Sequence, residues 1–241
     1  MSLPLPCADL AAAAVAQPCP LLFLDTAAIL DILRVPFRHG LQVDIVDSAA
    51  TLVDEALADP RRVWLVTSAN VIQEFEGRRT YVREELDAAI RDLDVSIARV
   101  SNVAKLAYPE RRSVSLDLAE LKLGQRIQGI MDRLVDSMVI FQGTPICVSK
   151  ARNRVWAGLP PSSRSQQEFK DCEIFEEFLE LLSAIRGQGF EPPAIFVTPN
   201  REDYGPPPEG YPQITTDLSA WGAQYAANLS WARSLIWPRT G

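Results

Sequence analysis

Three short apolar runs most constrain how this chain folds. They occupy residues 21–24, 63–67 and 194–198, and each is bounded by polar residues. Runs of this length suit buried strands rather than core helices. Segments with helical spacing of apolar residues separate them. This alternation predicts an α/β fold with three layers, in which helices cover both faces of a mostly parallel central sheet.

The remaining segments are expected to be mainly helical. Residues 78–141 have helical character almost throughout and predict a helical hairpin of two long segments, 80–107 and 116–141. Further helices are expected at 27–34, 47–59, 166–186 and beyond residue 216, whereas residues 1–20 are expected to wrap the surface and residues 142–165 to be irregular. We therefore expect one domain over residues 1–241, with a mainly helical insertion at 78–165.

Composition indicates a globular protein with a substantial core. Hydrophobic residues make up 47% of the 241 residues and charged residues 23%, which is unlike a disordered chain. No apolar run approaches the roughly 20 residues that cross a bilayer, so no membrane association is expected. The N-terminal segment lacks the basic leader of a signal peptide. The four cysteines form no CxxC pair, which argues against zinc fingers and disulfides and favours a cytoplasmic location.

The histidine content limits the chemistry. His39 is the single histidine, so multi-histidine metal sites are excluded and a Ser-His-Asp triad lacks support. Hydrolytic chemistry would rest on carboxylates, which bind hard cations such as Mg²⁺ and Mn²⁺. The net charge of −7 argues weakly against a nucleic-acid coat protein. However, 20 of the 24 basic residues are arginine, which binds phosphate in a bidentate manner, so charge does not decide the matter.

Four carboxylates follow the expected strands or begin helices. Asp25 directly follows the first strand, Glu74 lies on the second turn after the second, Asp171 is early in the 166–186 helix, and Asp203 follows the third strand. The carboxyl ends of parallel strands face one crevice. Clustered carboxylates repel one another and are stable mainly around a cation. Two divalent ions about 4 Å apart can promote phosphodiester hydrolysis.

The same segments resemble a known family. FLDTAAILDIL, VTSANVIQEFE, KDCEIFEEFLELL and FVTPNREDY are similar, in this order, to the four acidic motifs of the PIN domain (PilT N-terminal) nucleases. The resemblance implies a PIN-like fold and a Mg²⁺- or Mn²⁺-dependent endoribonuclease. It also implies that Asp25, Glu74, Asp171 and Asp203 are the catalytic metal ligands.

Two of the motifs depart from the common family pattern. Ala27 stands where the family usually has asparagine, and the last motif is one residue longer, with Asn200 where the first acid often lies. A PIN-like subgroup with a long helical insertion resembles this form, and its helix start matches Asp171, Ile174 and Glu176. Asn200 and Glu176 are therefore expected to be auxiliary site residues.

Basic residues near the third motif are candidates for binding RNA. Arg152, Arg154, Arg164 and Lys170 precede or begin this motif, and they either form a phosphate clamp or belong to a solvated loop. The resemblance implies RNA as the main partner. It also implies an antitoxin or another protein partner, or a homodimer.

Each candidate also has a structural alternative. Asp25 could simply cap a helix, Asp171 could be a first-turn acid, Asn200 and Asp203 could close a turn, and Glu76 competes with Glu74. At the level of function, one alternative is a non-catalytic PIN-like scaffold that binds RNA or a protein. Another is a phosphatase of the haloacid dehalogenase type, but that family needs a second Asp where this chain has Ala27.

Overall fold

The computed structural model describes residues 3–108, 120–163, 168–208 and 210–238. They form a three-layer α/β domain around a six-stranded, all-parallel sheet with the strand order β1-β4-β3-β2-β5-β6. The strands are β1 (Leu5–Pro6), β2 (Leu21–Leu24), β3 (Trp64–Ser68), β4 (Val139–Gln142), β5 (Ala194–Val197) and β6 (Ala223–Ala226). The expected α/β class and parallel sheet are confirmed.

Strand β2 is at the centre of the sheet because all four of its side chains are apolar. They are fully buried, as parallel strands covered on both faces require. The ring of Phe23 packs against Phe178 and Phe196, with centroids 5.2 and 5.4 Å apart. After β2 the chain adds β3 and β4 on one side and later β5 and β6 on the other. The strand order thus reverses between β2 and β5, the position where α/β sheets form crevices.

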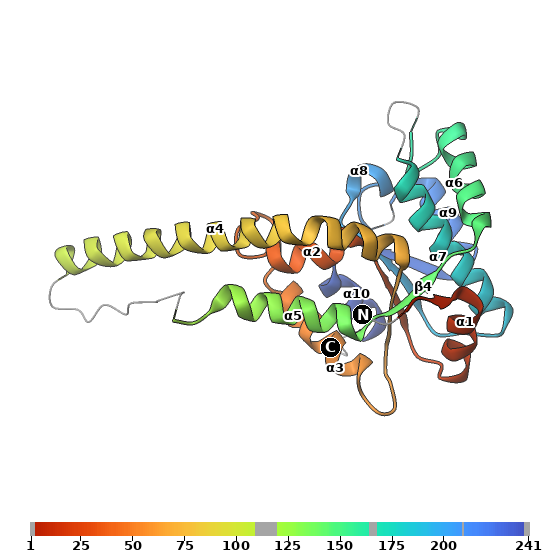
Figure 1. Cartoon of the computed structure of the whole chain (residues 1–241), viewed down its shortest axis with the longest axis horizontal. Coiled ribbons are helices and arrows are strands. Elements are labelled where there is room, and N and C mark those ends of the chain that lie inside the picture. The colour runs from red at the N-terminus through yellow and green to blue at the C-terminus, as the bar shows by residue number, and fades with distance from the viewer. Residues whose placement is uncertain (1–2, 109–119, 164–167, 209, 239–241) are drawn as a thin grey trace.

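Helices cover both faces of the sheet (Figure 1). The helices are α1 (Cys7–Ala16), α2 (Thr26–Arg34), α3 (Asp44–Ala56), α4 (Ala69–Ala107), α5 (Leu123–Ser137), α6 (Pro145–Ala157), α7 (Phe169–Gly187), α8 (Arg201–Tyr204), α9 (Pro212–Ser219) and α10 (Leu229–Ile236). Helix α7 packs against α1 and α6, whereas α2, α3, α5 and α10 pack together with the base of α4.

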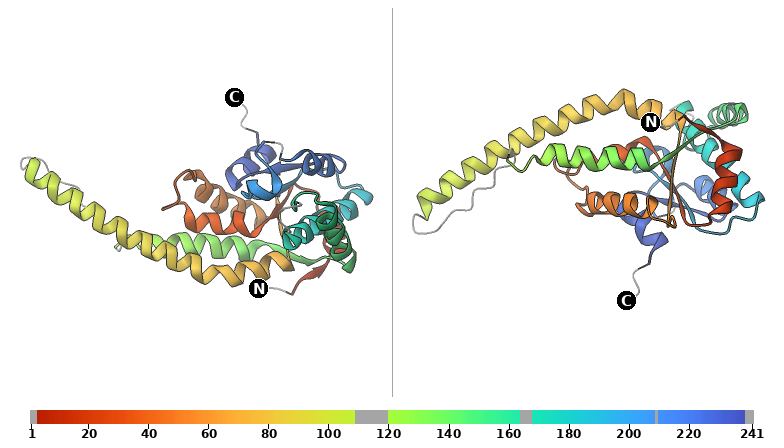
Figure 2. Two further views of the ribbon diagram at one scale, coloured as in Figure 1. Left: turned by 90° about the horizontal axis from the view of Figure 1, so that it is seen from above. Right: turned by 60° about the horizontal axis from the view of Figure 1, so that its bottom comes forward.

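Helix α4 extends far beyond the body of the molecule (Figure 2). Ser68 caps its first turn by accepting a 3.4 Å hydrogen bond from the amide of Val71. Its 39 residues correspond to a length of about 58 Å. Its buried side chains end at Leu86. The inner half therefore belongs to the core, and the outer half projects into solvent.

Several expected elements differ from the structure. Residues 1–20 do not merely wrap the surface, because they supply edge strand β1 and helix α1, whose Leu10 is fully buried. Residues 139–142 form strand β4 instead of ending a helix, and residues 142–165, expected to be irregular, contain helix α6. Strand β6 interrupts the helical C-terminal part. The segment 78–165 therefore contributes β4 and α6 to the body, in addition to α4 and α5.

Within the described ranges, no helix combines the length and the apolar character needed to cross a bilayer. Cys7, Cys19, Cys147 and Cys172 are buried free thiols.

Candidate functional site

Asp25 lies at the carboxyl end of β2, on the crevice side of the reversal in strand order. Its Oδ1 accepts a 2.7 Å hydrogen bond from the amide of Thr26, and its Oδ2 accepts one of 2.7 Å from the Thr198 hydroxyl. The residue is only 3% exposed. Burial raises the pKa of Asp25 to about 6, the hydrogen bond from Thr198 opposes this shift, and the charge of Glu74 adds to it. Asp25 thus caps α2, as the simpler hypothesis predicted, and is also a buried, oriented carboxylate.

Asp171 is on the first turn of α7, half-buried beside the same sheet edge. Burial and then the charges of Asp25, Asp203, Glu74 and the nearby Glu168 raise the pKa of Asp171 to about 8. The start of α7 is held by Tyr204, whose buried hydroxyl donates a 3.2 Å hydrogen bond to the carbonyl of Asp171. Four carboxylates that are distant in the sequence therefore interact electrostatically around Asp171.

Asp203 lies on the short helix α8 and is oriented by Asn200, which caps the start of this helix. Asn200 Oδ1 accepts a 3.3 Å hydrogen bond from the amide of Asp203, and Asn200 Nδ2 donates a 2.5 Å hydrogen bond to Asp203 Oδ2. Burial raises the pKa of Asp203, and the hydrogen bond from Asn200 opposes the increase. Asn200 is thus both a helix cap and a support for the acid, so the two hypotheses for it are compatible.

Glu74 reaches the site from the second turn of α4. Its side chain is 12% exposed and forms a 2.9 Å ion pair with Arg78. Glu76, its sequence competitor, faces outward and pairs with Arg79 at 3.4 Å. The charge of Glu74 acts on both Asp25 and Asp171, which selects Glu74 as the helix α4 member of the cluster.

The donor set of this cluster suits a hard divalent cation. Its four side chains offer only carboxylate oxygens, which Mg²⁺ and Mn²⁺ prefer. A cation would also relieve the repulsion that raises the pKa of Asp171. As the side chains stand, no three acidic, cysteine or histidine residues of the described ranges are arranged closely enough to hold one ion. Cation binding would therefore require side-chain movements that draw the carboxylates together.

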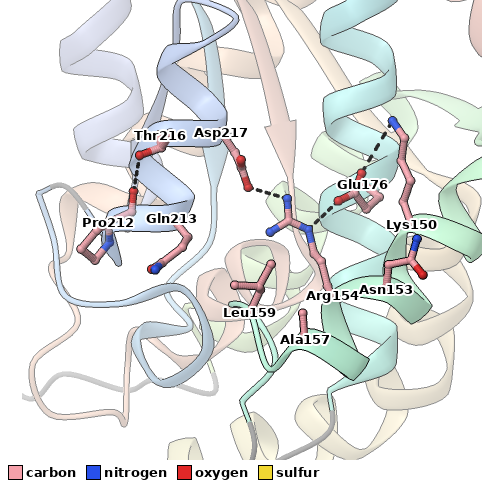
Figure 3. A pocket seen from close by; sticks show the side chains of 10 residues that line it. All are labelled: Lys150, Asn153, Arg154, Ala157, Leu159, Glu176, Pro212, Gln213, Thr216 and Asp217. Atoms are coloured by element: carbon pink, nitrogen blue, oxygen red, sulfur yellow. Dashed lines mark hydrogen bonds and ion pairs between the residues drawn. The ribbon is translucent and has the colours of Figure 1, made fainter.

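Glu176 lies apart from the four acids. Its carboxylate accepts a 2.5 Å ion-paired hydrogen bond from Arg154 Nε and lies 3.9 Å from Lys150 Nζ. Figure 3 shows this side of α7, where Arg154 also bridges to Asp217 on α9 at 2.5 Å. The structure thus places Glu176, expected as an auxiliary site residue, in an ion pair with Arg154.

The predicted basic residues differ in their positions. Arg154 is buried between two carboxylates, bonds the carbonyl of Pro160 at 2.8 Å and stacks over Phe175, so its guanidinium is used inside the protein. Arg152 on α6 and Lys170 beside Asp171 are exposed and can face a substrate. Arg164 lies outside the described residues.

Two hollows lie near the candidate site. One of about 400 Å³ is lined by Asp203, Glu202, Ser162 and Tyr211, so it reaches one of the four acids. The other, of about 500 Å³, lies over the Arg154 ion pairs, with Asn153, Leu159 and Gln213 in its wall (Figure 3). The loop at Pro160 contributes to the first hollow and bonds Arg154 beneath the second.

Sequence reasoning missed Thr198 as a site residue. Thr198 follows β5 directly, and the preceding Val197 pairs with Leu24 in the sheet, a register that the sequence alone does not give. Parallel pairing therefore sets Thr198 beside Asp25. Glu177, a second carboxylate of α7, is also buried. It accepts a 2.9 Å hydrogen bond from Asn70, and burial raises its pKa to about 7.

Comparisons with models of protein families, with curated proteins and with solved structures found no significant match. The functional argument therefore rests on the residues of this chain.

Proposed function

We propose that this chain is a Mg²⁺- or Mn²⁺-dependent endonuclease that cleaves RNA. The observation that carries the proposal is the electrostatic coupling of Asp25, Glu74, Asp171 and Asp203 at one edge of a parallel sheet. Such a cluster is unfavourable without a cation. Arg78 pairs with Glu74 and lowers the pKa of Asp25, but the pKa values of Asp25 and Asp171 remain raised. RNA as the substrate, and the PIN-like family itself, are carried by the resemblance of the four motifs.

The protein side chains have distinct roles in this proposal. Asp25 and Asp171 would hold the cation, and Glu74 and Asp203 would complete its ligand set directly or through water. Thr198, Asn200 and Tyr204 would position Asp25, Asp203 and α7 respectively, because their hydrogen bonds leave these groups little freedom. Exposed Arg152 and Lys170 would bind backbone phosphates. A bound divalent cation would supply positive charge at the phosphate and make an attacking water more acidic.

Protonation would regulate the site. The pKa of about 8 at Asp171 means that the metal-free protein retains a proton there at neutral pH. Binding of a divalent cation would displace this proton, because ligands must be deprotonated. We therefore expect activity to rise with pH from about 6 to 8.

The direct test is cleavage of labelled single-stranded RNA and DNA in the presence of Mn²⁺, Mg²⁺ or EDTA. We expect metal-dependent cleavage of RNA by the wild type and a loss on the order of 100-fold or more in Asp25→Asn. Asp31→Asn is the matched control, since Asp31 is equally buried on α2 but pairs with Arg34 and Arg38 away from the cluster.

Three results would contradict the proposal in whole or in part. Cleavage that survives in Asp25→Asn would move the catalytic centre elsewhere. Absence of Mn²⁺ binding to the wild type in calorimetry would favour the non-catalytic scaffold that binds RNA or a protein. Cleavage of DNA in preference to RNA would retain the metal centre but change the substrate class.

A further inference from the structure

The outer half of α4 carries an apolar seam. The seam consists of Ile90, Leu93, Ile97, Val100, Ala104 and Ala107. Successive residues of the seam are three or four positions apart, as in a coiled coil. Leu93 is 40% and Val100 69% exposed. Contiguous exposed apolar surface of this kind marks a contact site. This half projects away from the body of the molecule (Figure 2). Ile97 and Ala104 are half-buried, and Ile90 also packs against the core beside Gly124 of α5, so the exposed part of the seam begins at Leu93.

We propose that this seam binds the same seam of a second copy of the chain, with the two helices antiparallel. Residue sizes favour this direction. When Ile97 faces Val100 of the second copy, Leu93 faces Ala104 and Ile90 faces Ala107. Each layer then joins a large side chain to a smaller one, which gives layers of similar volume. A parallel pair would place alanine against alanine in two layers and would leave gaps there.

Charge favours the same direction. Residues 84–94 contain five acids and one base, whereas residues 95–108 contain two bases, Arg99 and Lys105, and no acid. Antiparallel pairing sets the acidic half of each helix against the basic half of the other. Parallel pairing would align like charges, which is unfavourable and weakens specific association.

Helix stability also calls for a partner. Beyond Leu86 none of the side chains of α4 is fully buried. Most of the stability of a helix in a protein comes from packing of its amphipathic face, so a partner on the seam would stabilise this half of α4. Pairing over the six seam positions would bury a stripe about 26 Å long. The pairing is independent of the acidic site, so the nuclease proposal and this one can fail separately.

The test begins with sedimentation equilibrium of the full-length protein over a range of concentrations. We expect a monomer–dimer equilibrium that weakens by on the order of 100-fold in Leu93→Glu/Val100→Glu. The matched control is Val95→Glu/Leu106→Glu, since Val95 and Leu106 are 61% and 84% exposed on the opposite face of the same helix. Circular dichroism verifies that both variants remain folded.

Cysteine cross-linking tests the direction of the pair and does not depend on the glutamate variants. The four native cysteines are buried, so an introduced thiol reports on its own position. Leu93→Cys mixed with Ala104→Cys is expected to cross-link, whereas Leu93→Cys alone is not, because antiparallel pairing separates its two copies by about 16 Å. A monomer at every concentration, a dimer equally weakened by the control, or cross-linking of Leu93→Cys to itself would overturn the proposal.

Discussion

The hydroxyl of Thr198 donates a 2.7 Å hydrogen bond to the carboxylate of Asp25, although 173 residues separate them in the chain. The two residues follow neighbouring strands, β2 and β5, at the point where the strand order reverses. This hydrogen bond lowers the pKa of Asp25 against the larger effect of burial. Thr198 therefore keeps a nearly inaccessible acid available for ionisation.

Replacement of Thr198 by valine should raise the pKa of Asp25 and weaken cation binding. We expect Mn²⁺ affinity, measured by calorimetry at pH 7, to fall roughly 10-fold, together with a loss of about 1–2 kcal/mol in stability. Thr67→Val is the control, because the buried Thr67 hydroxyl bonds the carbonyl of Leu24 at 2.8 Å. It should lose similar stability and retain its affinity. Equal losses of affinity in both variants would assign Thr198 a purely structural role.

The acidic cluster should make the metal-free protein less stable as pH rises. The pKa values of Asp25 and Asp171 are raised to about 6 and about 8 in the folded state. The folded state therefore binds more protons than the unfolded state above about pH 4, and its free energy of unfolding falls as pH increases toward 8. Thermal melting in EDTA should show a lower Tm at pH 8 than at pH 5.

The variant Asp171→Asn should remove part of this pH dependence. An amide cannot ionise, so we expect the variant to be more stable than the wild type at pH 8, by about 1–3 kcal/mol, and similar to it at pH 5. The measurement is chemical denaturation at both pH values. A variant that is less stable than the wild type at pH 8 would show that Asp171 is not under electrostatic stress.

Truncation of Asn200 should affect the site more than its role as a helix cap explains. Asn200→Ala removes both the cap of α8 and the hydrogen bond to Asp203. Asn228→Ala removes a comparable cap from α10, where Asn228 accepts a 2.8 Å hydrogen bond from the amide of Trp231. Both should lose about 1 kcal/mol, but only Asn200→Ala should lower cleavage activity, roughly 10-fold or more. Equal activities would place Asp203 outside the working site.

Replacement of Arg154 should lower the stability of the protein, whereas replacement of Arg152 should weaken RNA binding. Arg154→Ala leaves Glu176 and Asp217 without their shared partner, and we expect a loss of about 3–5 kcal/mol in the free energy of unfolding. Arg152→Ala should change stability by less than about 0.5 kcal/mol and weaken RNA binding, measured by fluorescence anisotropy. RNA affinity that is unchanged in Arg152→Ala would remove α6 from the substrate surface.

The strands with strongly apolar sequences could be predicted, and the weaker ones could not. Residues 21–24 and 194–197 are continuous apolar runs that become fully buried strands. In contrast, β6 reads Ala-Gln-Tyr-Ala and β4 directly follows a helix of similar hydrophobicity. Their strand conformation depends on pairing with β5 and β3, which is tertiary information that a local sequence pattern does not contain.

The sequence motifs identified the four candidate carboxylates, but not the residues that hydrogen-bond to them. Asp25, Glu74, Asp171 and Asp203 each stand on an element that reaches the crevice edge. Glu176 and Arg154 were expected near them because of their positions in the chain. Helical geometry turns Glu176 to another face of α7, where the two charges neutralise each other. Hydrogen-bonding residues such as Thr198 are common in any sequence, so only the register identifies them.

The central position of β2 also bears on synthesis of the protein. This strand is synthesised well before its neighbour β5 and the residues Thr198, Asn200 and Asp203, since 173 residues separate Asp25 from Thr198. Pairing across such a long separation is slow compared with local helix formation. A nascent chain thus lacks a complete acidic cluster until β5 and the residues after it have emerged, which would keep the proposed nuclease inactive during that part of its synthesis.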